Sequence, residues 1–251
     1  PRKTKTAKYA GNWDPKAKQP WSYKLQKWIL SNTFLTKNMK VLVYGEWENQ
    51  TKNIKPFFTA SYNEEDKIKL KSLDLKARID FVFVGTLSIG KNPLYAVKLV
   101  EELFKNGFDV SLDLYGEGGE RNAIENYIES NSLEKIVILR GNQNQEILKK
   151  AYQNAHFVLL ASKSEGWPKA IAEGMFWGCI PLATKVSCVP FMLDYGKRGI
   201  LLNMILDEDI QQLVTLLNNE ISFVGKREKA SDWSRKFTLN IFEKEIKEIL
   251  K

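Results

Sequence analysis

Short apolar runs alternate with amphipathic stretches from residue 81 to the end of the chain. The runs are three to six residues long, rich in β-branched and aromatic residues, and continuous rather than alternating. This pattern is typical of strands buried on both faces of a sheet. The predicted strands are Phe81–Val84, Val110–Tyr115, Ile136–Leu139, Phe157–Leu160, Ile180–Ala183 and Ile200–Leu202.

Helical spacing of apolar residues marks the segments between these runs, as Leu94, Val97, Val100 and Leu103 illustrate. Repeated β-α units with short joins predict an α/β fold with a Rossmann-like, doubly wound parallel sheet. The predicted helices between strands are Pro93–Lys105, Glu120–Glu129, Asn144–Gln153 and Pro168–Trp177. Three more, Glu208–Asn218, Lys226–Phe237 and Asn240–Leu250, are expected to cover an edge of this domain or cap it.

The first 71 residues follow another pattern. They hold one amphipathic helix, Trp21–Ser31, one short strand, Val41–Tyr44, and an aromatic connector, Lys55–Tyr62. One strand and one helix cannot enclose a core of their own. We therefore expect residues 1–60 to be the tail of a second α/β domain with a linker, and 61–251 to be a complete domain. On this interpretation the chain is a piece of a longer protein.

Charge divides the chain at the same place. The net charge is +8, but the first 71 residues carry 15 basic and 6 acidic residues, and the remainder carries 23 and 24. A hydrophobic fraction of 43% is normal for a globular protein and too high for a disordered one. No apolar run approaches the roughly 18 residues of a membrane-spanning helix. The basic excess leaves a nucleic acid or an anionic membrane surface as candidate partners.

Histidine and cysteine are too scarce for several kinds of site. His156 is the single histidine, which excludes a metal site built from several histidines. It lies in an apolar run, so a buried structural histidine is a better interpretation than a member of a catalytic triad. Cys179 and Cys188 form no CxxC pair, and no export signal precedes them, so we expect a cytoplasmic protein without disulfides.

Ligands of open α/β sheets bind beyond the carboxyl ends of the strands. After the first strand, Gly85 and Thr86 lead to Lys91, just before a helix start at Asn92 and Pro93, which suits a phosphate; a solvated lysine is the alternative. After the second strand, Gly116 opens a glycine cluster that permits close approach of a helix or of a ligand, without a dinucleotide fingerprint. After the third, Arg140 suits a base or simply the surface.

The fourth join is the most informative. Pro168 should open its helix, which places Glu165 in the preceding loop and Glu173 more than one turn inside. Amides from Gly166 to Lys169 would then face a ligand with the helix dipole behind them. Glu173 stands on a largely apolar helix and needs a partner, which sugar hydroxyls or an internal salt bridge could supply.

These joins together resemble retaining glycosyltransferases of the GT-B fold, the GT4-like group (glycosyl transferases group 1). Glu165 and Glu173 enclose seven residues, the EX7E motif of that family. Further residues agree in order and spacing: Gly85 to Lys91, Gly116 to Gly118, Ser162, Gly174, Met175, Gly178, Pro181, Val189, Pro190 and Gly199. The resemblance covers about residues 81–202.

The resemblance implies a donor site for a nucleotide sugar. Glu173 would bind the ribose hydroxyls, Glu165 the donor sugar and Lys91 the diphosphate, while amides near Gly166, Trp167 and Pro168 approach the donor. It implies a UDP- or GDP-sugar, a saccharide or lipid-linked acceptor, neither metal nor other cofactor, and no nucleic acid. The product would be a polysaccharide or glycolipid, made in the cytoplasm. The charge of the basic segment would then suit an anionic membrane, with an ordinary solvated face as the alternative.

One residue departs from the family pattern. Thr86 stands where the family has an arginine that helps to bind the diphosphate. Either Arg140, Lys163 or Lys169 replaces that arginine, or the leaving group is stabilised less strongly. Two other functions remain open at this point. A nucleotide-sugar epimerase or a phosphorylase could share the fold, although the single histidine disfavours an epimerase. A basic nucleic-acid-binding protein is the non-enzymatic alternative. A chain that lacks most of the acceptor-side domain is expected to be inactive alone.

Overall fold

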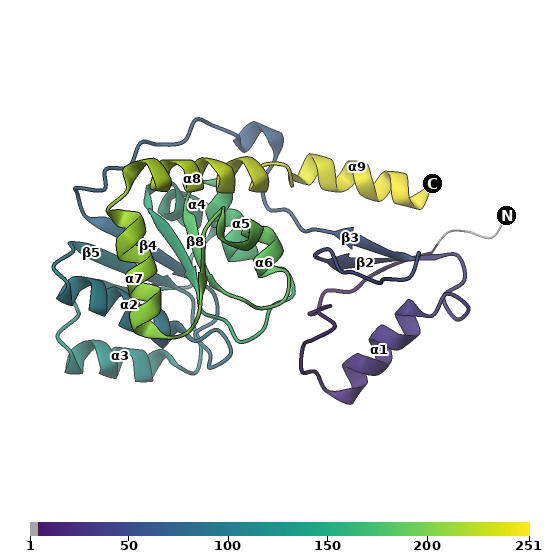
Figure 1. The fold of residues 1–251 in the computed structure, drawn as a ribbon, viewed down its shortest axis with the longest axis horizontal. Helices are drawn as coiled ribbons and strands as arrows, with labels where there is room; N and C mark the ends of the chain where they lie inside the picture. Colours follow the sequence, from purple (N-terminus) through teal and green to yellow (C-terminus); the bar gives the residue numbers. More distant parts are fainter. Residues whose placement is uncertain (1–4) are drawn as a thin grey trace.

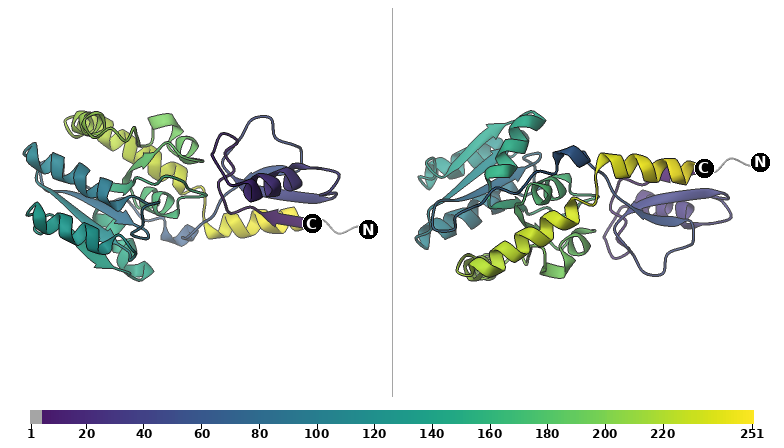
Figure 2. Two further views of the ribbon diagram at one scale, coloured as in Figure 1. Left: turned by 90° about the horizontal axis from the view of Figure 1, so that it is seen from below. Right: turned by 90° about the horizontal axis from the view of Figure 1, so that it is seen from above.

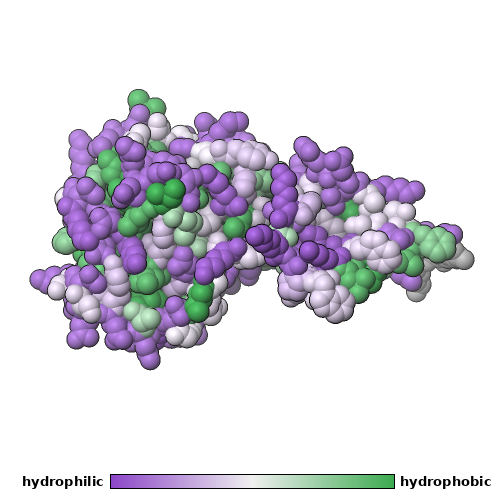
Figure 3. Space-filling view, turned by 60° about the horizontal axis from the view of Figure 1, so that its bottom comes forward, coloured by the Kyte–Doolittle hydropathy of each residue, from purple (hydrophilic) through white to green (hydrophobic). Residues whose placement is uncertain are grey.

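The computed structural model describes residues 5–251. Two lobes of unequal size meet at a constriction (Figure 3). The larger lobe is built on a six-stranded parallel sheet and the smaller on a three-stranded parallel sheet (Figure 1). The α/β class and parallel sheet predicted from the sequence are therefore confirmed.

The large sheet has the strand order β6-β5-β4-β7-β8-β9, with every neighbouring pair parallel. The winding reverses between β4 and β7, and such a reversal opens a crevice at the carboxyl ends of the central strands. The predicted strands agree with the observed ones to within two residues. The observed bounds are β4 (Ile79–Val84), β5 (Val110–Tyr115), β6 (Val137–Gly141), β7 (Phe157–Leu160), β8 (Ile180–Thr184) and β9 (Ile200–Leu202).

Helices cover both faces of this sheet. On one face α2 (Pro93–Lys105) packs on β5 and on α7 (Leu206–Leu217); on the other, α5 (Lys169–Phe176) packs on β7, β8 and α8 (Glu220–Ser234). The remaining elements are α3 (Arg121–Ser130), α4 (Gln145–Asn154), α6 (Val189–Met192) and the 3₁₀ turns Glu64–Asp66 and Asp194–Gly196. Two covered faces explain why β7 and β8 are buried along their whole length, whereas β4 and β5 each keep a partly exposed aspartate.

Aromatic stacking joins the two central strands. Phe81 of β4 lies directly opposite Phe157 of β7, and their rings stack with centroids 5.0 Å apart. Both side chains are fully buried, and burial of each contributes about 1.5–3 kcal/mol. The reversal of the sheet is thus fixed by a packed core rather than by loops.

The small lobe contains two strands that the sequence pattern did not predict. Its sheet is β1 (Lys5–Lys8), β2 (Met39–Tyr44) and β3 (Ile54–Phe57), and α1 (Trp21–Ser31) lies beside it. The strand β1 reads KTAK, with no apolar run, and β3 contains Pro56. Both are edge strands, where polar residues and a missing amide donor are tolerated. Trp13, Val41 and Val43 form the centre of a small separate core.

The last helix, α9 (Leu239–Leu250), leaves the large lobe and extends along the small one (Figures 1 and 2). Its Phe242 packs edge-on against Phe57 at 5.3 Å and Phe58 at 5.8 Å, and Lys40 donates a hydrogen bond to the carbonyl of Ile249. The expectation that all three final helices cover the large domain is therefore wrong for α9. An amphipathic pattern defines an apolar face but not the surface that receives it.

His156 and the two cysteines are structural. His156 is buried beside Phe223, and its Nδ1 accepts a hydrogen bond of 3.1 Å from the amide of Asp80. Burial lowers its pKa, so the ring is neutral near pH 7. Cys179 and Cys188 are buried free thiols. Between residues 5 and 251, no helix combines the length and the apolar character that crossing a membrane requires.

Candidate functional site

Two loops meet at the carboxyl edge of the large sheet, where its winding reverses. One follows β4 and carries Lys91, and the other follows β7 and carries Glu165. The amide of Lys163 donates a 2.8 Å hydrogen bond to the carbonyl of Gly90, which ties the two loops together. This is the place where open α/β sheets bind ligands.

Lys91 and Glu165 form an ion pair across these loops. The Nζ of Lys91 lies 2.5 Å from Oε1 of Glu165. The Glu165 side chain is 7% exposed and that of Lys91 31%. A carboxylate buried to this degree needs a partner, and Lys91 supplies both charge and a hydrogen bond. The structure thus brings together the two residues that the resemblance assigns to the diphosphate and to the donor sugar.

Glu173 has neutral partners instead. Its Oε1 accepts a 2.6 Å hydrogen bond from the hydroxyl of Ser61, and its Oε2 accepts one of 3.4 Å from Tyr152. The Nζ of Lys169 is 3.8 Å away, but that lysine is 59% exposed, so the ion pair is weak. Burial, and next the charge of Glu173, raise the pKa of Tyr152, which keeps its hydroxyl protonated. Glu173 is held mainly by hydroxyl groups.

Two of the predicted glycines are required for close backbone approach. A Cβ on Gly116, whose φ is +145°, would lie 1.9 Å from the carbonyl oxygen of Gly85. A Cβ on Gly166 would lie 2.3 Å from the carbonyl oxygen of Ala10, in the small lobe. These glycines therefore pack the loops of the site against each other and against the small lobe.

Trp167 turns its side chain away from the loop edge. Its ring is buried, 5.7 Å from Tyr44 and 5.9 Å from Phe237, between the two lobes. Pro168 is the N-cap of α5, as the sequence predicted for the helix start. At Trp167 it is the backbone, not the ring, that can approach a ligand.

Arg140 does not join the Lys91–Glu165 pair. Its Nε donates to Asp113 at 2.9 Å, and it lines a cavity over the sheet face with Asp80, Ser111 and Lys150. Among the residues from 5 to 251, no contact links it to Lys91 or Glu165. Thr86 is exposed on the β4 loop. Of the three cations expected to replace the arginine at that position, Lys163 stands on the nearest loop and Lys169 is the one beside Glu173.

The sequence analysis did not identify three residues that contact the site, namely Ser61, Tyr152 and Cys188. Ser61 lies in the connector after β3, Tyr152 on α4, and neither is close in sequence to Glu173. Cys188 donates through Sγ to the carbonyl of Gly166 at 3.1 Å. Burial raises its pKa to about 12, so it is a hydrogen-bonding thiol rather than a nucleophile. Only the polar residues of the aromatic connector offered a signal for Ser61.

The small lobe borders the site. A Cβ on Gly45, at the end of β2, would lie 2.8 Å from the Cβ of Cys188, so the two lobes touch at this point. Beside the contact a cleft of about 630 Å³ is lined by Trp47 and Gln50 of the small lobe and by Lys185 and Pro190 of the large one. The loop that carries Glu165 therefore faces the small lobe, where Gly166 meets Ala10.

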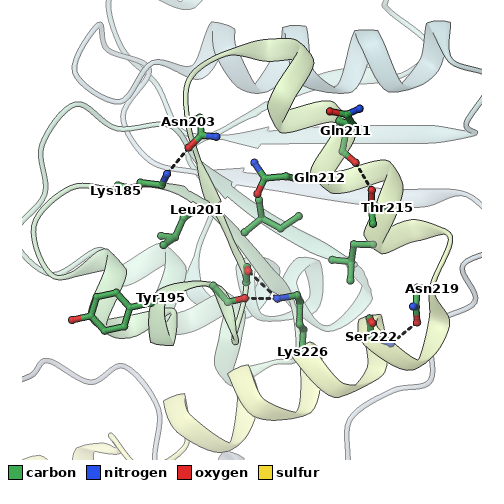
Figure 4. A pocket seen from close by; sticks show the side chains of 14 residues that line it. Lys185, Tyr195, Leu201, Asn203, Gln211, Gln212, Thr215, Asn219, Ser222 and Lys226 are labelled. Atoms are coloured by element: carbon green, nitrogen blue, oxygen red, sulfur yellow. Dashed lines mark hydrogen bonds between the residues drawn. The ribbon is translucent and has the colours of Figure 1, made fainter.

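Another large cavity lies away from this edge. It measures about 710 Å³ and is lined by residues of β9, α7 and α8, among them Asn203, Gln211 and Lys226 (Figure 4). None of the predicted site residues lines it. Among residues 5–251, no cluster of three or more His, Cys, Asp or Glu is arranged to hold a metal ion. The candidate site is therefore identified by the residues at the loop edge, not by the size of a cavity.

The family follows from this arrangement together with a direct match. The family model described as "Glycosyl transferases group 1" matches residues 64–236, more than half of the chain and all of the large sheet. The chain belongs to the glycosyl transferases group 1. The resemblance found in the sequence is thereby confirmed at the level of the family.

Individual relatives are distant or short in overlap. The chain is 32% identical over 95 residues to a UDP-N-acetylglucosamine–peptide N-acetylglucosaminyltransferase GtfA subunit from Limosilactobacillus reuteri, covering 38% of this chain and 17% of that protein. Across the curated relatives, the match spans 17% to 43% of their own length. The activity of a whole relative therefore cannot be assigned directly to this chain.

Solved structures establish the fold. S. aureus TarM, in complex with fondaparinux, α-GlcNAc-glycerol and UDP, superposes with a TM-score of 0.72 at 18% identity, covering 99% of this chain and 51% of that one. Anabaena HepE, in complex with UDP and glucose, gives 0.74 at 15% identity, covering 99% and 72%. Both lobes match, so the chain has the GT-B glycosyltransferase fold.

Proposed function

We propose that this chain carries the donor site of a retaining glycosyltransferase. The enzyme would transfer a sugar from a UDP- or GDP-sugar to a saccharide or lipid-linked acceptor. The observation that carries the proposal is the Lys91–Glu165 ion pair at the reversal of the sheet, with Glu173 eight residues further on and held by hydroxyls. The cation fits the diphosphate of such a donor. The two carboxylates, which differ in their surroundings, fit its sugar and its ribose.

Each charged group has a defined role in this proposal. Lys91 binds the diphosphate and stabilises the charge that develops on it as the sugar departs. Glu165 accepts hydrogen bonds from the donor sugar, and Glu173 accepts them from the ribose. The amides from Gly166 to Lys169, at the start of α5, face the donor with the positive end of that helix. Lys91 takes the place that a metal ion holds in other transferases, so we propose that no metal is needed.

The two lobes divide the substrates between them. We propose residues 61–251 as the donor domain and 1–60 as part of an acceptor-side domain with its linker; residues 1–4 lie outside the described structure. TarM and pneumococcal GtfA were each solved with UDP, which supports a uridine donor as the first to test. The cleft between Trp47 and Pro190 is the natural route for an acceptor.

A membrane surface is a further proposed partner. From residue 15 to 45 there are six lysines and no acidic residue. On and beside α1, Trp21, Trp28 and Phe34 are exposed by 76%, 58% and 85%. Lysines flanking exposed aromatic side chains suit an anionic lipid interface, where a lipid-linked acceptor would be found. Flotation with anionic and with neutral vesicles tests this, and equal binding to both would refute it.

Calorimetric titration with UDP, GDP and single-stranded RNA at two salt concentrations tests the donor site. We expect binding of one nucleoside diphosphate that depends weakly on salt. Salt-sensitive RNA binding without nucleotide binding would overturn the proposal in favour of a basic nucleic-acid-binding protein. With an active enzyme, NMR of the newly formed anomeric centre distinguishes retention from inversion, and release of free nucleoside diphosphate distinguishes transfer from epimerisation.

A further inference from the structure

Ser61 connects the linker between the lobes to the donor site. It lies between β3 and the 3₁₀ turn Glu64–Asp66, on a stretch without regular structure. Its hydroxyl donates to Oε1 of Glu173 on α5 at 2.6 Å, and its carbonyl accepts from Nε2 of Gln145 on α4 at 3.1 Å. The linker is thus fastened across two helices by one residue.

The hydrogen bond from Ser61 to Glu173 is a strong one. An oxygen–oxygen distance of 2.6 Å is typical of a hydroxyl that donates to an ionised carboxylate. The Glu173 side chain is 16% exposed, so little water competes for Oε1. Among residues 5–251 the nearest cation to Glu173 is Lys169 at 3.8 Å, so the Ser61 hydroxyl, at 2.6 Å, is the shortest of the described contacts that orient this carboxylate.

The hydrogen bonds of Glu173 also leave acceptor positions for a ligand. An ionised carboxylate offers about four acceptor positions, two on each oxygen. Ser61 occupies one position on Oε1 and Tyr152 one on Oε2. One position remains on each oxygen, and a ribose presents two adjacent hydroxyls that could fill them.

We propose that Ser61 is a positioning residue for nucleotide recognition: from the linker, it holds Glu173 in the orientation that receives the ribose hydroxyls of the donor. The inference rests on the donor site proposed above and adds to it a residue outside the motif. It predicts that removal of the Ser61 hydroxyl weakens the part of the affinity that depends on the ribose, and leaves the part that depends on the diphosphate unchanged.

Contacts of the linker also couple Ser61 to the small lobe. Phe58, three residues earlier, packs on Phe237 at 4.9 Å and on Phe242 of α9. The amide of Leu239, at the start of α9, donates to the carbonyl of Tyr62. Both chain segments that cross between the lobes therefore meet next to the residue that orients Glu173.

Calorimetric titration of this chain with UDP and with 2′,3′-dideoxy-UDP tests the inference. Wild type should bind UDP more tightly, and the ratio of the two affinities measures the ribose contribution. Ser61→Ala should reduce that ratio by about tenfold through weaker UDP binding alone. Ser61→Thr, which keeps a hydroxyl, should restore most of the ratio.

Ser234→Ala is the matched control. The Ser234 hydroxyl, on α8, donates at 2.6 Å to the carbonyl of Ala172 on α5, the helix that also carries Glu173. This control should leave the ratio unchanged. An equal loss for both ligands, an unchanged ratio in Ser61→Ala, or tighter UDP binding by that variant would overturn the role of Ser61. Wild type that binds neither UDP nor GDP would instead overturn the proposed donor site, and the inference with it.

Discussion

The two ends of the proposed donor site contain the same side chain in opposite surroundings. Glu165 lies in a loop, buried, with a lysine 2.5 Å away. Glu173 lies inside α5 and contacts two hydroxyls, and among the described residues its nearest cation is the exposed Lys169, 3.8 Å away. The first carboxylate is paired with a cation, whereas the second is held by hydroxyls and keeps part of its acceptor capacity. Two glutamates of one motif are thus prepared for different partners.

Lys91 explains why the difference matters. In the proposed site, a diphosphate would compete with Glu165 for this lysine, so the ion pair would have to loosen when the donor binds. Glu173 would face no such competition, because ribose hydroxyls would donate to it and add to the bonds already present. Substitutions at the two ends should therefore differ in the sign of their effect on nucleotide affinity.

The largest effect is expected for Lys91→Ala. Without this cation the leaving diphosphate loses its stabilising charge, and kcat should fall by about 10²–10³-fold. Steady-state kinetics of the active enzyme with its donor measure this. Lys105→Ala, at the C-terminal end of α2, the helix that follows the Lys91 loop, and paired with Glu101 and Glu102, should leave kcat unchanged. Wild-type turnover in Lys91→Ala would remove the catalytic role from this end of the site.

Glu173→Gln should come next. An amide has one acceptor oxygen and no charge, so UDP affinity should fall by about 10- to 100-fold, the cost of weakening charged hydrogen bonds. Calorimetry of the chain measures the dissociation constant directly. Glu125→Gln, on the outer face of α3, is a suitable control. An unchanged constant would mean that the ribose lies elsewhere.

A smaller effect, with the opposite sign, is expected for Glu165→Gln. Loss of this carboxylate frees Lys91 for the diphosphate. The affinity for UDP should therefore equal that of wild type or exceed it by up to about threefold. The same titration measures it. A loss as large as that of Glu173→Gln would show that the two ends do not differ, and would break the comparison.

The smallest effect is on the stability of the large lobe, which carries both glutamates. Burial lowers the pKa of His156 from 6.5, so the unfolded chain binds a proton more readily than the folded one. The stability contributed by the neutral ring is therefore complete above about pH 6.5 and is lost as the pH falls below it. Urea unfolding at about pH 7.5 and about pH 5.5 should show this slope. His156→Asn should flatten it, and an equal slope in that variant would assign the effect to other groups.

Much of the large lobe could be predicted because its strands are buried on both faces. Phe157–Leu160 was predicted to the residue, since burial on both faces leaves an uninterrupted apolar run. Val110–Tyr115 was also predicted to the residue, although Ser111 and Asp113 alternate with its apolar residues. The small lobe was harder. The strands β1 and β3 lie at sheet edges, so a polar tetrapeptide and a proline are compatible with them, and neither shows an apolar run.

The candidate site shows the same division. Lys91, Glu165 and Glu173 were found from their order and spacing, because the loops that hold them follow directly from the β-α pattern. Ser61 and Tyr152 were not, since they are 112 and 21 residues away from Glu173 in the chain. A contact over such a separation leaves no periodic signal in a single sequence.

The sequence by itself therefore determined the parallel sheet, the order of its elements and the family, because local periodicity and short-range spacing encode them. The tertiary structure alone decided three things: that α9 returns to the small lobe, that Lys91 pairs with Glu165, and that a linker serine holds Glu173. Each of these depends on which surfaces meet after folding. An amphipathic helix or a charged side chain states what kind of partner it needs, and only the packed chain decides which one it contacts.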